Sequence, residues 1–397
     1  MNIGDRLRQL RGEARPESDD ALATRLQRLR PPARHATMDP DDCSVLGTAL
    51  AAEQTTDGLL IRERHYRLSP ASCVGVDPSA LPETCRLPPL DWLYIDTETT
   101  GLSSGVGNLA FMIGVARFSA TDQLEVRQYV LGRYAAERAM LTDLLATVGT
   151  ASTGLVSYNG KSFDLPLLAN RCRMQRVAAR IDTLPHLDLM YTVRRAYRRH
   201  WPDCRLQTAE RRLLGLQRVD DLPGAQAPAA WRTWLCERDT AAIARVLEHN
   251  FQDVVSLALL HRCLAGAYLG QADSPLDHAA IGRAWLDAGD PQRAQRIWEN
   301  AGESLSDDGR LDLARLYRRQ GDWASAETQW LALYARGNAA ASLELSKLHE
   351  HRRRDLRAAM RYAGSCTADE RDARCSRLRR KLDATPQLTL RLSLRTR

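Results

Sequence analysis

YIDTETTGL, residues 94–102, begins as an apolar, β-prone run and continues with two acids one residue apart. Residues two apart on a strand point to the same face, so Asp96 and Glu98 should lie side by side. Two carboxylates at that spacing resist double ionisation, which predicts a compensating cation, and their oxygen atoms suit Mg²⁺ or Mn²⁺. The alternative is a strand end with two solvated acids. Thr99, Gly101 and Leu102 follow in a predicted turn, where glycine permits close approach of the backbone to a ligand.

Two later segments carry further candidate ligands. YNGKSFDLPLL, residues 158–168, places Asp164 at the start of a predicted helix, where it could hold a metal or cap backbone N–H groups. HNFQDVVSL, residues 249–257, places His249 and Asp253 on one helical face, because four residues return to the same side of a helix. A histidine titrates near neutrality and suits a general base, although a histidine on the helix surface is the alternative.

These three segments, in this order, resemble the DEDD (DnaQ-like) superfamily of 3′→5′ exonucleases, which have the ribonuclease H-like fold. With the spacer DLPGAQAPAAW, residues 221–231, they look like its YprB-type branch, which often carries helical repeats. The resemblance covers residues 59–264 well and the C-terminal third loosely. It implies that two divalent cations, Mg²⁺ or Mn²⁺, are held by Asp96, Glu98, Asp164 and Asp253. The superfamily has a tyrosine base at the spacing of His249, or a histidine one residue further away.

Polar residues near these acids are candidates for substrate contact. Asn159 and Lys161 lie in the loop before Asp164, and Thr99, Gly101 and Leu102 follow Glu98. An asparagine can bond a sugar or phosphate oxygen, and Asn250 either does so or orients a metal ligand. A solvated loop lysine is an equal alternative for Lys161. Asp188 resembles an accessory acid of the superfamily, and His186 is expected to be structural.

The order of predicted elements indicates an α/β domain of the ribonuclease H-like class. Strands are expected at 58–68, 91–97, 109–118, 124–131 and 154–158, and helices at 135–148, 165–174, 205–214, 229–235 and 240–264. Strands surrounded by helices bury both faces of a sheet. We therefore predict a mobile arm over 1–50, the nuclease domain over 51–266, helical repeats over 270–384 and a basic tail over 385–397.

A repeat marks the C-terminal third. Gly289-Asp290 with Ala294 recurs as Gly321-Asp322 with Ala326, and again without the glycine as Arg354-Asp355 with Ala358. This period of about 32 residues is close to that of tetratricopeptide repeats, in which stacked helical pairs bury their faces against neighbours. The sequence therefore predicts tetratricopeptide-like repeats, which would dock a protein partner or guide the substrate.

The charge distribution and the cysteines of the sequence limit the kinds of protein that it can encode. Residues 351–397 hold 14 lysines and arginines against 5 acids, whereas the remainder holds 42 against 44, so the excess of +7 arises at the C-terminus. A basic region is typical of polyanion binding, although solvated arginine-rich surface is the alternative. The nine cysteines contain no Cys-x-x-Cys pair, which favours reduced thiols without disulfides. No apolar run could span a membrane, and no secretory signal is evident, so the cytoplasm is expected.

Two hypotheses follow. The first is a metal-dependent 3′→5′ exonuclease acting on single-stranded RNA or DNA through a two-metal mechanism. The second is a non-catalytic scaffold on the same fold that binds nucleic acid or protein. Retention of all four carboxylates favours catalysis. An endonuclease of the ribonuclease H type is less favoured, since it usually carries a lone Asp on its first strand rather than Asp-x-Glu.

Overall fold

The computed structural model describes residues 40–384, apart from 56–57, 69–79, 86, 88–90, 102–106, 150–152, 179–180, 219–220 and 271–274. Most of the predicted arm, the predicted basic tail and Leu102 therefore lie outside the described residues. Within the described ranges, no helix combines the length and the apolar character that a membrane span requires. The eight cysteines in these ranges form no disulfides.

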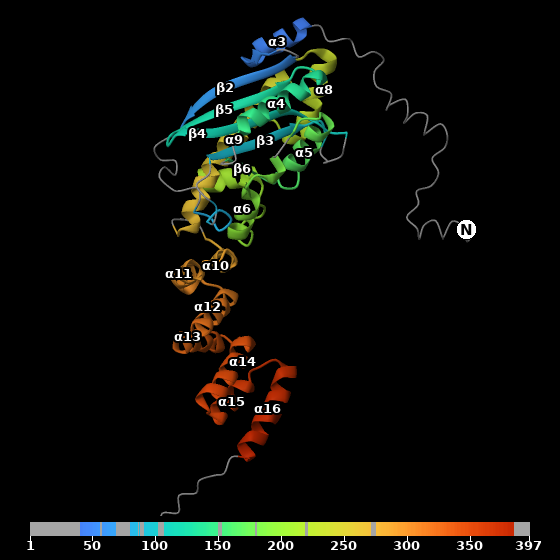
Figure 1. The fold of residues 1–397 in the computed structure, drawn as a ribbon. Helices are drawn as coiled ribbons and strands as arrows, with labels where there is room; N and C mark the ends of the chain where they lie inside the picture. The colour runs from blue at the N-terminus through green and yellow to red at the C-terminus, as the bar shows by residue number, and fades with distance from the viewer. Residues whose placement is uncertain are drawn as a thin grey trace, which may run out of the picture.

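A seven-stranded mixed sheet forms the N-terminal part of the protein (Figure 1). Its strands lie in the order β1-β2-β5-β4-β3-β6-β7. Strands β2 to β5 pair antiparallel, whereas β6 and β7 run parallel to β3. The strands are β1 (Glu53–Gln54), β2 (Leu59–Arg67), β3 (Asp91–Thr99), β4 (Ala110–Ala120), β5 (Gln123–Leu131), β6 (Thr153–Ser157) and β7 (His186–Asp188).

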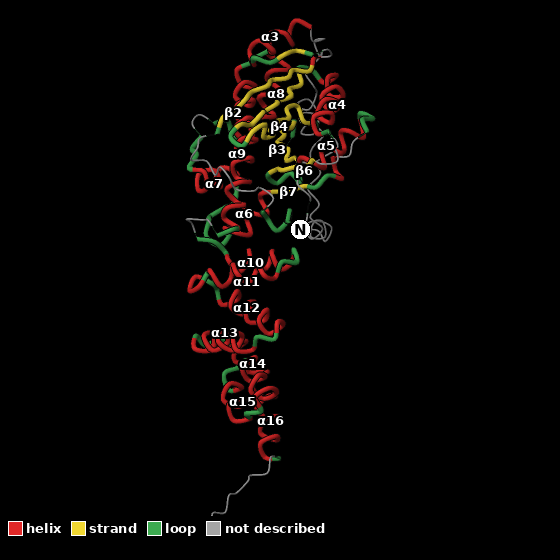
Figure 2. Tube along the Cα trace, turned by 60° about the vertical axis from the view of Figure 1, so that its left-hand side comes forward, coloured by secondary structure: helices red, strands yellow, loops and turns green. Residues whose placement is uncertain are grey.

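Helices cover the sheet and then continue as a column away from it (Figures 1 and 2). The helices of the sheet-containing part are α3 (Pro40–Leu50), α4 (Glu137–Val148), α5 (Asp164–Met174), α6 (Leu189–Tyr197), α7 (Leu206–Ala209), α8 (Ala227–Glu237) and α9 (Ala241–Tyr268). Those of the column are α10 (His278–Asp287), α11 (Pro291–Asn300), α12 (Asp307–Gln320), α13 (Trp323–Ala335), α14 (Ala339–Leu348), α15 (Leu356–Ala363) and α16 (Ala368–Asp383). The predicted fold class, an α/β domain followed by an all-α region, is confirmed.

The sheet separates two packed layers, as the inner strand β3 shows, because successive side chains of a strand alternate between faces. Leu93 and Ile95 pack in the cluster that contains α4 and α5. Trp92 and Tyr94 pack in the other cluster, where the His261 ring of α9 lies edge-on to both rings. The long helix α9 therefore lies on the face toward which Asp96 and Glu98 also point.

The repeated Gly-Asp pairs have a local explanation. Gly289, Gly321 and Arg354 all adopt positive φ, of 82°, 84° and 55°, which ends the first helix of each pair. The following Asp290, Asp322 and Asp355 each cap the next helix by accepting a backbone N–H bond from three residues ahead. The third copy keeps this geometry without glycine because Arg354 takes up the left-handed conformation itself. The repeat alanines Ala294, Ala326 and Ala358 are buried where paired helices meet.

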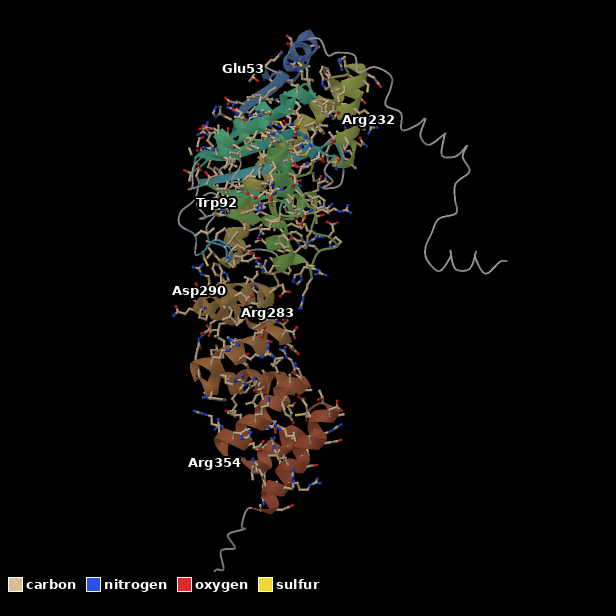
Figure 3. The ribbon with its side chains drawn as sticks, turned by 45° about the vertical axis from the view of Figure 1, so that its right-hand side comes forward. Glu53, Trp92, Arg232, Arg283, Asp290 and Arg354 are labelled. Carbon is tan, nitrogen blue, oxygen red and sulfur yellow. The ribbon has the colours of Figure 1, made fainter. Side chains whose placement is uncertain are left out.

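Two structural features lie at the predicted domain boundaries. Helix α3 forms within the range assigned to an arm, because Leu46 and Leu50 bury their side chains against the sheet. At the other boundary, one apolar cluster continues from α9 through Trp285 and Trp298 into the column. Glu53 and Arg354 lie at opposite ends of the molecule (Figure 3).

Candidate active site

The candidate site forms where β3 ends. Strands β3 and β6 are parallel, so their carboxyl ends share one edge of the sheet, and α5 begins after the β6 end. The pairing of β3 with β4 shifts register between Glu98 and Thr99, so regular pairing ends beside the acids. A cleft of about 340 Å³ opens there, lined by Asp96, Glu98, Asp164, His249 and Asp253 among others. Three elements far apart in sequence thus bring the predicted ligands together.

Asp96 is held by helix α9. The side-chain amide of Asn250 donates to Asp96 Oδ2 at 2.9 Å, and its oxygen accepts from Gln128 Nε2 at 2.9 Å. Asn250 fits there because β4 carries Gly114 opposite Asp96: a Cβ on Gly114 would lie 2.2 Å from Asn250 Oδ1. Asn250 is fully buried. Of the two roles predicted for Asn250, this geometry supports orientation of Asp96 rather than contact with substrate.

Asp164 approaches from the opposite layer. It is the first residue of α5, and its carboxylate accepts a hydrogen bond from the hydroxyl of Thr97, the residue between the two acids of β3. This contact fixes Asp164 at the end of β3. The negative charge of Asp164 raises the pKa of both Asp96 and Glu98, so it lies within electrostatic reach of each.

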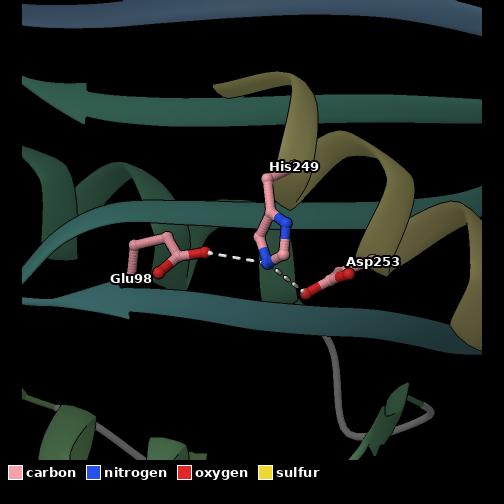
Figure 4. Close-up of side chains that lie close together, drawn as sticks. All are labelled: Glu98, His249 and Asp253. Carbon is pink, nitrogen blue, oxygen red and sulfur yellow. Dashed lines mark ion pairs between the residues drawn. The ribbon is translucent and has the colours of Figure 1, made fainter. Parts of the chain in front are cut away.

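His249 lies between Glu98 and Asp253 (Figure 4). Its Nε2 is 3.9 Å from Glu98 Oε1 and 3.4 Å from Asp253 Oδ2, while Nδ1 is 2.6 Å from Asp221 Oδ1. Arg218 Nη1 is also 3.1 Å from Nδ1, but one nitrogen cannot both donate and accept. The contact of Nδ1 with Asp221 is the shorter of the two and is charge-assisted. We therefore assign the ring proton to Nδ1, which donates it to the Asp221 carboxylate. The Nε2 lone pair then faces the cleft.

Burial and mutual repulsion define the electrostatics of the site. Burial raises the pKa of Asp96, and the charges of Asp253, Glu98 and Asp164 raise it further. Glu98 shows the same shift, with burial first and Asp253 and Asp164 next. Burial also raises the pKa of Asp253, although His249 and Arg218 oppose the rise. Clustered oxygen donors that are costly to ionise together fit divalent cations, which would remove that cost. Ligand atoms of Glu98, His249 and Asp253 all lie within 4.8 Å of one another.

Asp164 gives a prediction about pH. Burial raises its pKa from 3.8 to about 6, although the bond from Thr97 lowers it. A folded-state pKa above the unfolded value stabilises the protein below pH 4, and that stability is lost as pH rises through 6. With EDTA present, we expect Asp164→Asn to gain up to about 3 kcal/mol relative to wild type between pH 4 and pH 7. Urea unfolding at several pH values measures this difference, and a constant difference would contradict the proposed burial of the charge.

Of the other residues predicted to contact the substrate, some line the cleft and one does not. Thr99, Gly101 and Asn159 line the cleft, together with Phe163, which is 46% exposed. Lys161 lies outside the cleft lining, with its ammonium 5.7 Å from the ring centroid of Tyr191.

Asp188 and His186 hold the loop that contains Asn159 and Lys161. The Asp188 carboxylate is buried and accepts backbone N–H bonds from Asn159, Lys161 and Met190. Its role as an accessory acid stays a prediction. His186 is half-buried and contacts the Ser157 hydroxyl at 2.8 Å, as expected of a structural residue.

Sequence reasoning missed a second layer around the ligands. Arg218 contacts Glu210, Asp221, Asp253 and His249. Glu210 begins a π-helical turn, Glu210–Leu214, inside the range predicted as a regular helix. Asp221 was visible only as the first residue of the spacer before α8. Neither Arg218 nor Glu210 belongs to a periodic pattern, so no sequence signal pointed to them.

Comparison with known proteins agrees with this geometry. Residues 93–265 match the model of the RNase_H superfamily. The chain is also 32% identical over 290 residues to "Uncharacterized protein YprB" of Bacillus subtilis (strain 168), an alignment covering 70% of this chain and 69% of that protein. The matched range contains the four acids of the cleft, which β3, α5 and α9 supply. Residues 93–265 therefore match a domain of the RNase_H superfamily, and the chain belongs to the family of YprB.

Proposed function

We propose that this protein is a metal-dependent 3′→5′ exonuclease that hydrolyses phosphodiester bonds of single-stranded nucleic acid. Membership of a nuclease superfamily points to nucleic acid hydrolysis. The observation that supports the specific proposal is the meeting of Asp96, Glu98, Asp164 and Asp253 in one cleft beside His249. The Asp-x-Glu pair on β3 favours exonuclease over endonuclease chemistry, as in the DEDD superfamily that the sequence resembles.

The residues of the cleft have separate tasks in this proposal. Asp96, Glu98, Asp164 and Asp253 would hold two Mg²⁺ or Mn²⁺ ions, which supply charge stabilisation to the attacking and leaving oxygens of a phosphodiester. His249 accepts the proton of the attacking water at Nε2, since Asp221 holds the proton on Nδ1. Thr99, Gly101 and Asn159 position the terminal nucleotide along the cleft wall. The helical pairs of the column guide the substrate or dock a protein partner.

The alternative scaffold function is disfavoured by the cost of the acidic cluster. A binding scaffold gains nothing from placing Asp164 and Asp253 where their charges raise the pKa of Asp96 and Glu98, whereas a cation site requires such a cluster. The two functions differ in a simple assay. Purified protein with Mn²⁺ should shorten 5′-labelled single-stranded RNA or DNA one nucleotide at a time, and should act more slowly on duplexes. Binding of these substrates without cleavage would support the scaffold.

Cation binding should also stabilise the fold. A ligand that binds only the folded state raises the free energy of unfolding, by about 2.7 kcal/mol at a hundredfold excess over Kd. We therefore expect millimolar Mg²⁺ or Mn²⁺ to raise Tm by several degrees in scanning calorimetry, with NaCl of equal ionic strength as the control. Asp253→Asn should reduce this shift. The absence of any shift in the wild-type protein would argue against the proposed ligand set.

A further inference from the structure

Arg218 occupies an unusual place for an arginine. Its side chain is only 9% exposed, and it lies behind the cleft rather than along its lining. It follows the π-helical turn Glu210–Leu214 and reaches across to α9, where Nη2 donates to Asp253 Oδ1. The same guanidinium approaches Asp221 Oδ2 with Nη1 at 3.4 Å. One side chain therefore contacts both a predicted metal ligand and the acid that orients His249.

The two carboxylate oxygens of Asp253 therefore have different neighbours. Oδ1 is bonded to Arg218, whereas Oδ2 lies 3.4 Å from His249 Nε2, on the side of the cleft. Without Arg218, rotation of the carboxylate would exchange the two oxygens freely. Ligands of bound metals are commonly held in this way by outer partners, which fix their orientation.

Glu210 fixes the arginine in turn. It is buried, and it accepts from Arg218 Nε at 2.8 Å and from Nη2 at 2.6 Å in a bidentate pair. Glu210 starts the π-helical turn, a deviation from α-helix that is often found at functional sites. The charge of Glu210 also balances that of Arg218. The pair therefore adds no net charge to the site, and its effect on a cation should be geometric.

We propose that Arg218, anchored by Glu210, is a positioning residue that holds Asp253 with one oxygen facing the cleft and keeps Asp221 against His249. This inference rests on the proposed function, because it takes Asp253 to be a metal ligand. It adds two residues, Arg218 and Glu210, that the sequence motifs did not include. Both belong to the region between β7 and α8.

The first test keeps the charge and removes the geometry. In Arg218→Lys, one ammonium replaces the planar fork and cannot bond Glu210, Asp221 and Asp253 at once. Titration calorimetry should show a loss of Mn²⁺ affinity of about 10–100-fold, the usual effect of losing an outer partner of a metal ligand. Arg211→Lys is the matched control, since Arg211 is the exposed neighbour of Glu210, and it should bind Mn²⁺ like wild type.

The second test removes both charges together. Glu210→Met with Arg218→Met leaves neither member of the buried pair without the other, while Asp221 and Asp253 keep their contacts with His249. Such apolar replacements often fold normally. The net charge of the protein is unchanged, so the Coulomb effects of the two lost charges on a bound cation largely cancel. A fall in Mn²⁺ affinity similar to that of Arg218→Lys would therefore show that the positioning of Asp253 has been lost. The control is Glu137→Met with Arg171→Met, which removes a buried bidentate pair between α4 and α5 away from the cleft lining. If the first double variant does not fold, Arg218→Lys still decides.

Steady-state kinetics provides a second readout. Both Arg218 variants should lower kcat with little change in KM for nucleic acid, because Arg218 contacts Asp253 and His249 from behind and does not itself line the cleft. Wild-type Mn²⁺ affinity in both variants, or a higher affinity, would overturn the inference while leaving the proposed function intact. If the wild-type protein itself binds no Mn²⁺, both the proposed metal site and this inference are wrong.

Discussion

Asp96→Asn should lower nuclease activity by more than about 100-fold, since losing even an outer partner of a metal ligand costs about 10–100-fold. Asp96 lies among Glu98, Asp164 and Asp253, whose charges raise its pKa. The substitution removes one oxygen ligand and one negative charge. The fold should survive, because the amide oxygen of the new residue can still accept the bond from Asn250. In EDTA, Tm should stay equal or rise, since repulsion among the acids is relieved.

The control for this experiment is an acid away from the cleft. Asp122 pairs with Arg67 at the surface between β4 and β5, so Asp122→Asn should leave both activity and Mn²⁺ binding unchanged. Activity is measured with Mn²⁺ on a 5′-labelled single strand, and Tm is measured by calorimetry. Wild-type turnover by Asp96→Asn would contradict the metal site. A large fall of Tm in EDTA would instead mean that Asp96 serves the fold.

His249→Ala should lower kcat by on the order of 10²–10⁴, the usual contribution of a positioned general base. Its Nε2 faces the cleft, and Asp221 holds the opposite nitrogen at 2.6 Å. Mn²⁺ binding should survive, because four carboxylates remain as ligands. The variant should also lose the part of the pH–rate profile that reports deprotonation of the base.

The control here is His65→Ala, which changes an exposed histidine on β2. Calorimetric titration with Mn²⁺ separates two roles for His249, since its ring lies within ligand distance of Glu98 and Asp253. Loss of rate with intact Mn²⁺ binding supports the base. Loss of both would make His249 a ligand instead, and a rate near that of wild type would exclude either role.

Much of the site follows from local periodicity. Asp96 and Glu98 share a face because side chains on a strand repeat every two residues, and His249 and Asp253 share one because of the helical repeat. Their meeting in one cleft is a long-range event, which the family resemblance suggested and the pairing of β3 with β6 explains. Helix α5 begins one residue before the predicted helix 165–174, and Pro166 fits its first turn because the missing N–H is not needed there.

The contacts that surround the predicted metal ligands could not be predicted from the sequence, for physical reasons. Arg218 meets Asp253 across 35 positions of chain, through a loop and a π-helical turn that no periodicity describes. Asn250 was open to two roles because its burial depends on Gly114, a residue of another strand. The positive φ of Arg354 was unexpected, since a residue other than glycine takes up the left-handed conformation there, directly before the cap formed by Asp355.

The central claim is tested most directly by the shape of the substrate. Linear and circular forms of one single strand, internally labelled, are incubated with the protein and Mn²⁺, with EDTA as the blank. The account predicts release of mononucleotides from the linear form alone, and strong inhibition when its 3′-terminal linkage is blocked by phosphorothioate. Cleavage of the circular strand would show endonuclease action. If neither the linear nor the circular strand is cleaved, the protein would be a binding scaffold. Either result would contradict the account.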